Sequence, residues 1–247
     1  MSAAVTNKKH SPRHYYALLT SVIVLSFIAP LVDHTIWSHI LIGILLTLVL
    51  LFSALSVRSE EKLDWLSISL AVLATVGWTL AFCTNMVPFK GPVFQILSLG
   101  MILLFFLRIV RVMVLDLLTG SINSNRICGG ACVYVLIGFC FALVHMMVAI
   151  HDPHAYRDNV KGYDSTRERH ERYPLLIYFS FCTLSTVAYG DIIPVSRLAR
   201  ALSCLEAMSG QLYLAIMVAR LVGMHTAVKA EPRRLEAEKV LEAKLAE

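Results

Sequence analysis

The sequence predicts an all-α membrane protein, because it is much more apolar than a soluble domain and its apolar residues gather into long runs. Hydrophobic residues make up 57% of the 247 residues and charged residues 16%. Soluble domains are about half apolar and about a quarter charged. Apolar runs of about twenty residues can cross a bilayer as helices. Six spans are predicted: Tyr15 to Val32, Ile36 to Val57, Trp65 to Val87, Val93 to Leu118, Ile127 to Ile150 and Leu202 to Gly223.

The basic residues predict which ends of these spans face the cytoplasm. They gather in the leader of residues 1–14 and around the connections that follow the second and fourth spans, whereas the first and third connections hold only Lys90. Cytoplasmic connections of multi-span proteins carry an excess of lysine and arginine. We therefore expect both termini in the cytoplasm and a location in the plasma or inner membrane. The residues concerned are Lys8, Lys9, Arg13, Arg58, Lys62, Arg108, Arg111 and Arg126.

The composition argues against several other classes of protein. The net charge of +5 is modest and scattered, so no nucleic-acid partner is expected. The six cysteines lie in or beside apolar runs without the spacing of a zinc site or a disulfide framework, and we expect them to be reduced packing residues. No nucleophile elbow, phosphate loop or H-E-x-x-H motif occurs, so neither an enzyme nor a cofactor is predicted.

The chain changes character between the fifth and sixth spans. Residues 151–174, here called the turret, are strongly charged and end at Pro174. The apolar stretch from Leu175 to Thr183 follows and is too short to span. We expect it to form a re-entrant helix, which is permitted at membrane depth only where protein or a water-filled cavity covers it.

Residues 183–191, here called the filter segment, follow at once and read Thr-Leu-Ser-Thr-Val-Ala-Tyr-Gly-Asp, with Pro194 three residues later. They resemble the selectivity-filter signature T-x-T-T-V-G-Y-G-D-x-x-P of the tetrameric potassium channel superfamily. The order of segments from Ile127 to His225 resembles that family too, and the stretch from Glu206 to Gly223 is similar to the last helix of six-span bacterial members.

The resemblance implies a homotetramer in the bilayer, with a four-helix unit at 15–118 in the position of a voltage sensor, a pore domain at 127–225 and a cytoplasmic helical tail at 226–247. It implies that backbone carbonyls, with the Thr186 hydroxyl, bind permeant K⁺ and that Asp191 stabilises the filter. Thr183 and Ser185 would support the filter. The filter residues so implied are Thr186, Val187, Ala188, Tyr189, Gly190 and Asp191.

Two filter positions depart from the family pattern. Ser185 replaces a threonine, which is a mild change, and Ala188 replaces a glycine that has a left-handed backbone in the family. An L-residue pays about 1 to 2 kcal/mol for that conformation, so either local packing keeps it or the filter relaxes. Three functions follow: a potassium-selective channel, a poorly selective cation channel, or a non-conducting membrane scaffold or sensor with a channel fold.

Four charged residues and a glycine are further candidates for support, gating or voltage sensing. Glu206, inside the last span, either braces the filter or re-entrant helix or reaches the outer interface. Gly210 has the spacing of the family's gating hinge. Arg220 either snorkels to the cytoplasmic surface or gates the pore. Arg108 and Arg111 fit positive-inside anchors, with a voltage sensor as the alternative.

The turret histidines and the tail are each compatible with two roles. His151, His154 and His170, with His145 just inside the fifth span, allow modulation by protons or metals, although a solvated charged loop also accounts for them. The tail either associates around the fourfold axis or is a solvated helix. It is too short for a ligand-binding domain, so ligand gating would require an unknown partner.

Overall fold

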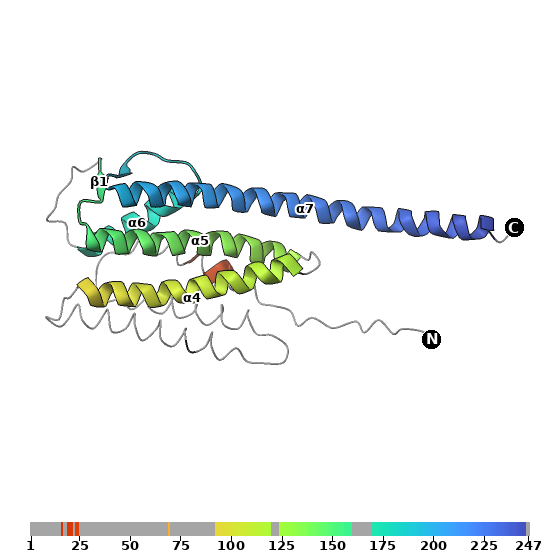
Figure 1. Cartoon of the computed structure of the whole chain (residues 1–247), viewed down its shortest axis with the longest axis horizontal. Coiled ribbons are helices and arrows are strands. Elements are labelled where there is room, and N and C mark those ends of the chain that lie inside the picture. The colour runs from red at the N-terminus through yellow and green to blue at the C-terminus, as the bar shows by residue number, and fades with distance from the viewer. Residues whose placement is uncertain are drawn as a thin grey trace.

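The computed structural model describes residues 92–119, 124–159 and 169–245, together with a few isolated positions between 16 and 69. Its elements are α4 (Pro92–Thr119), α5 (Ser124–His151), β1 (Tyr156–Asp158), α6 (Arg169–Leu184), β2 (Ile192–Pro194) and α7 (Arg197–Leu245) (Figure 1). The leader and the first three predicted spans lie outside the described residues apart from those positions.

Three helices of the described part are long and apolar enough to cross a membrane. They cover Pro92–Leu118, Ile127–His151 and Arg197–Arg220, and they coincide with the fourth, fifth and sixth predicted spans. The prediction of a helical membrane protein is thereby confirmed for this part of the chain.

Helices α4 and α5 pack along most of their length through one apolar stripe on each helix. On α4 the buried residues recur every three or four positions, at Ile102, Phe105, Ile109 and Met113, which places them on one face. Phe106 meets Phe139 of α5 with ring centroids 6.2 Å apart. Helix α5 thus forms the centre of the bundle, with α4 on one side and α6 and α7 on the other (Figure 1).

Helix α6 begins earlier than the predicted re-entrant helix. Its apolar part is Pro174–Leu184, but the helix starts at Arg169, because a search for apolar runs does not register a charged first turn. Phe181 packs edge-on against Phe139 at 5.4 Å. A Cβ at Gly138 would lie 2.7 Å from the Phe181 ring, so glycine is required for this close approach of α5 and α6.

A short antiparallel sheet, which the sequence did not predict, joins the turret to the chain that follows the filter segment. Tyr156 pairs with Pro194 and Asp158 with Ile192. Strands of three residues carry too little alternation to be recognised in a sequence. The sheet brings the start of the turret beside the C-terminal end of the filter segment, here called its outer end.

Helix α7 runs from Arg197 to Leu245 without a break, so the predicted last span and tail form a single helix. It begins before the predicted Leu202 because Ser196 caps it: the Ala199 amide donates to the Ser196 hydroxyl oxygen at 3.1 Å. Figure 1 shows α7 continuing well past the ends of α4 and α5.

Candidate functional site

After α6 ends at Leu184, the backbone of the filter segment alternates in the sign of φ. Thr186, Ala188 and Gly190 have positive φ angles of 59°, 47° and 78°. Positive φ is uncommon for residues other than glycine and is strained where it occurs. Every second residue from 186 to 190 is therefore left-handed, and Ala188 has the left-handed backbone that the resemblance implied for its position.

The N-terminal end of the segment, here called its inner end, is hydrogen-bonded to the last turn of α6. The amide of Val187 donates to the Cys182 carbonyl at 2.9 Å, and the amide of Thr186 donates to the Thr183 carbonyl at 3.0 Å. The Ser185 hydroxyl donates to the Phe181 carbonyl at 2.6 Å. These bonds satisfy carbonyl groups that a helix end leaves without intrahelical partners.

Asp191 anchors the outer end of the segment. Its carboxylate accepts from the Tyr178 hydroxyl at 2.7 Å and from the Ile192 amide at 2.9 Å. The Tyr178 ring also stacks on the Tyr189 ring, with centroids 6.5 Å apart and planes 6° apart. The hydrogen bond donated to Asp191 raises the pKa of Tyr178.

Asn159, at the end of β1, provides a second attachment at the outer end. Its backbone amide donates to the Asp191 carbonyl at 2.7 Å, and its side-chain amide donates to the Gly190 carbonyl at 3.0 Å. The turret therefore holds the last two residues of the filter segment in place.

Two residues of α7 meet the inner end of the filter segment. The Gln211 side-chain amide donates to the Thr186 hydroxyl oxygen at 3.3 Å, while that hydroxyl donates to the Ser185 carbonyl at 2.7 Å. Gly210 is buried, and a Cβ there would lie 2.3 Å from the Leu184 carbonyl oxygen. Gly210 thus has a packing role, and α7 is helical on both sides of it.

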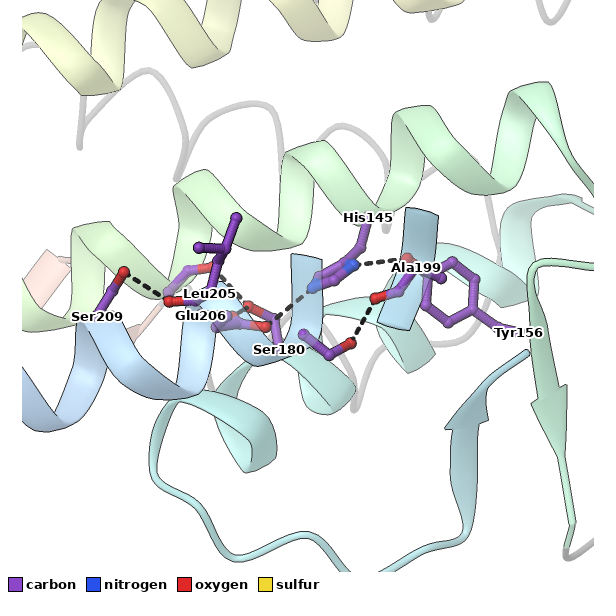
Figure 2. Close-up of polar contacts among 9 residues, drawn as sticks. His145, Tyr156, Ser180, Ala199, Leu205, Glu206 and Ser209 are labelled. Atoms are coloured by element: carbon purple, nitrogen blue, oxygen red, sulfur yellow. Dashed lines mark hydrogen bonds and ion pairs between the residues drawn. The ribbon is translucent and has the colours of Figure 1, made fainter. Parts of the chain in front are cut away.

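Glu206 of α7 is fully buried and lies against α6, not at the end of its span. Figure 2 shows its carboxyl group between His145 of α5 and Ser180 of α6. His145 Nε2 lies 2.9 Å from Glu206 Oε2, and the Ser180 hydroxyl oxygen contacts Oε1. His145 and Ser180 are fully buried as well.

The cluster continues beyond the carboxyl group at both ends. His145 Nδ1 lies 2.5 Å from the Tyr156 hydroxyl of β1, and the Ser180 hydroxyl lies 2.8 Å from the Gly138 carbonyl of α5. Phe179 packs edge-on against the His145 ring at 5.2 Å. Burial raises the pKa of Tyr156, which keeps its hydroxyl protonated and able to donate.

The arginine residues considered above as anchors, voltage sensor or gate take no part in these contacts. Arg108 is half-buried and Arg111 exposed on α4, and Arg220 is half-buried on α7. Acidic partners for a voltage sensor would come from the first three spans, which lie outside the described residues. The described cysteines, histidines and acidic residues form no cluster that could hold a metal ion.

Sequence reasoning missed the partners of the filter segment, which are Tyr178, Asn159 and Gln211. It also missed Ser180 as the partner of Glu206, and it placed His145 with the turret histidines. One signal could have joined His145 to Glu206. Ionisable residues inside membrane spans tend to pair with one another, and these two lie in neighbouring spans.

Three helices long and apolar enough to cross a membrane, and a shorter apolar helix that ends in a strained loop, indicate a helical membrane protein. Residues 155–226 match a protein family described as "Ion channel". The chain therefore carries an ion channel domain, which confirms its resemblance to the channel superfamily. The matched residues are less than a third of the chain, and a search among curated proteins found no match.

Proposed function

We propose that the protein is a passive channel for potassium ions, in which four identical chains surround a pore lined by backbone carbonyls of residues 186–190. The alternating φ angles of Thr186, Ala188 and Gly190 are the observation that carries this proposal. When left-handed and right-handed residues alternate, successive carbonyl groups turn toward the same side of the chain. A row of carbonyls on one side is what an ion needs in place of its hydration shell.

Assembly of four chains is supported by what a single chain leaves exposed. Residues 185–190 are all exposed, with Tyr189 at 70%. One loop cannot encircle an ion, and the filter segment occurs once in the sequence. In the apolar stretch of α7 only 11% of the residues are buried, against 56% in that of α5. Helix α7 therefore has apolar surface for neighbouring chains and lipid.

Ala188 favours a second candidate, a poorly selective cation channel. A left-handed alanine costs about 1 to 2 kcal/mol more than a right-handed one, and a tetramer carries that cost four times. The strain favours any filter state in which Ala188 relaxes and its carbonyl turns away from the pore. Loss of one ring of carbonyls would weaken the discrimination between potassium and sodium.

The reversal potential of the reconstituted protein tests the proposal. Full-length protein in a planar bilayer, with both ions on both sides and opposite gradients of potassium and sodium, should reverse near the potassium equilibrium potential. A reversal near zero would favour the poorly selective channel. Absence of current from protein shown to be tetrameric, both for the natural sequence and for Ala188→Gly, would favour the non-conducting scaffold.

A further inference from the structure

The elements α5, β1, α6, β2 and α7 are here called the pore unit. The cluster around Glu206 joins four of them through side chains at its centre. Glu206 comes from α7, His145 from α5, Ser180 from α6 and Tyr156 from β1 (Figure 2). His145 and Glu206 form the fully buried acid–base pair of the described residues. Within the described part of the chain, no lysine or arginine contacts this carboxyl group, and its basic partner there is His145.

The number of protons that the cluster needs follows from its contacts. Four contacts run in a chain from Tyr156 to His145, to Glu206, to Ser180 and on to the Gly138 carbonyl. Each contact requires one proton between its two heavy atoms. Tyrosine, neutral histidine and serine supply one proton each, which leaves one contact without a proton if Glu206 is ionised.

The shortage falls on Ser180. Its hydroxyl contacts two acceptors, the Gly138 carbonyl and Glu206 Oε1, but it has a single proton. With an ionised Glu206, one of these contacts would bring two oxygen atoms together without a hydrogen. Moving a proton onto His145 does not remedy this, because the Ser180 hydroxyl still faces both acceptors.

A protonated Glu206 satisfies every contact. Its Oε1–H donates to the Ser180 hydroxyl oxygen, which donates in turn to the Gly138 carbonyl. His145 Nε2–H then donates to Glu206 Oε2, and Tyr156 donates to His145 Nδ1. The cluster is also uncharged in this state, which avoids the cost of burying a carboxylate or an ion pair away from water.

We propose that Glu206 is held as a neutral carboxylic acid and acts as a positioning residue for the pore helix α6, donating its proton to Ser180. Ser180 lies on α6 six residues before Thr186. The acid thereby ties α6 to α7 and, through Gly138, to α5. This role rests on the proposed channel function, since its purpose is to hold the helix from which the filter segment starts.

The titratable groups that face the acid are few. His145 on α5 contacts it directly, and Tyr156 on β1 contacts the far side of the same imidazole. Tyr134 on α5 is turned to another partner, the Leu184 carbonyl, at 3.4 Å. Ser180 on α6 does not titrate, so it is not the source of the proton on Glu206.

Infrared spectroscopy of the full-length protein in lipid nanodiscs tests the protonation state without requiring conduction. The natural protein should show the C=O stretch of a buried carboxylic acid, and Glu206→Gln should lack it. His145→Phe removes the hydrogen bond to Oε2, so the acid band should move to a higher wavenumber. A spectrum in which Glu206→Gln removes a carboxylate band, and no acid band, would overturn the proposal.

Ion flux into liposomes tests the positioning role with conservative variants. Glutamine can donate to Ser180 and accept from His145 as the acid does, so Glu206→Gln should keep potassium flux within about twofold of the natural protein. Glu206→Asp keeps the ionisable group but shortens its reach, and it should lose about tenfold or more. Equal losses in both variants would refute the neutral acid. If no variant conducts, the channel function fails, while the infrared result still decides the protonation state.

Discussion

Gly210 of α7 lies directly against the carbonyl oxygen of Leu184, the last residue of α6. A Cβ at position 210 would lie 2.3 Å from that oxygen and 3.2 Å from the carbonyl carbon. Contacts this short do not occur, so α7 can approach the end of α6 only because residue 210 has no side chain. Four residues earlier, Glu206 meets Ser180, which itself lies four residues before Leu184. One face of α7 therefore holds α6 at two points, one helical turn apart on each helix.

Gly210→Ala should destabilise the pore unit, because the new methyl group overlaps backbone that cannot move aside as a side chain can. We expect a loss of about 1 to 3 kcal/mol per chain. Thermal unfolding of the purified protein in detergent measures the change.

Gly223→Ala is the matched control, since a Cβ there meets nothing within 4 Å. It should leave stability unchanged or raise it by up to about 1 kcal/mol, because alanine favours a helix over glycine. A pure hinge at Gly210 predicts a different result: Gly210→Ala would then stabilise α7 as Gly223→Ala does and would alter only the opening of the channel.

The sequence was sufficient to predict the apolar helices α4, α5 and α7 and to place the filter segment after a short apolar helix. Hydropathy reports how long an apolar helix is, and the filter segment is a local string of residues, so neither depends on contacts between distant residues. The charged start of α6, the capped start of α7 and the three-residue strands escaped for the same reason: none of them has an apolar pattern long enough to recognise.

The partners across the pore unit could not be predicted in this way. His145 and Glu206 are 61 residues apart, and Asn159 and Gly190 are 31 apart. Which residues meet depends on how the helices cross and on where Gly138 and Gly210 let them approach closely. An acid inside a span could have indicated that a partner exists, but it would not have identified His145.

Ala188→Gly should stabilise the assembled protein, because Ala188 has a φ of 47° in a conformation that costs alanine about 1 to 2 kcal/mol. In a tetramer the gain would be about 4 to 8 kcal/mol if each chain keeps the same backbone. Heat-induced dissociation of the proposed tetramer, followed on gels in potassium, measures it.

The same substitution on helix α7 serves as the control. Ala215 is exposed in the middle of the helix, where glycine costs about 1 kcal/mol relative to alanine. Ala188→Gly and Ala215→Gly should therefore change stability in opposite directions. If both lower it, the backbone at 188 is not strained in the assembled protein.

Tyr178→Phe should loosen the outer end of the filter segment while leaving the aromatic stack on Tyr189 in place. The lost hydrogen bond goes to a carboxylate, and such bonds contribute about 1.5 to 3 kcal/mol. We expect the open channel to close more readily during sustained activity, as measured by single-channel recording. Asp191→Asn should act in the same direction, and the double variant should add little, because both changes remove one interaction.

The pH dependence of this hydrogen bond follows from the raised pKa of Tyr178. A tyrosine whose pKa is higher in the folded state contributes stability that is fully present below its unfolded value of about 10. That contribution is lost only as the pH rises through the folded value. The difference in stability between the natural protein and Tyr178→Phe should thus be constant from neutral pH to about pH 10 and shrink above it.

Gln211→Leu should strengthen ion binding at the inner end of the filter segment. In the natural chain the Gln211 amide donates to the Thr186 hydroxyl oxygen at 3.3 Å, so it competes with a cation for that oxygen. A weak hydrogen bond of about 0.5 to 1.5 kcal/mol corresponds to a change in affinity of roughly 2- to 10-fold. Calorimetric titration of the purified protein with potassium measures the affinity. Gln211→Asn, whose amide is too short to reach Thr186, should give the same increase, whereas an effect of side-chain polarity alone would leave Gln211→Asn unchanged.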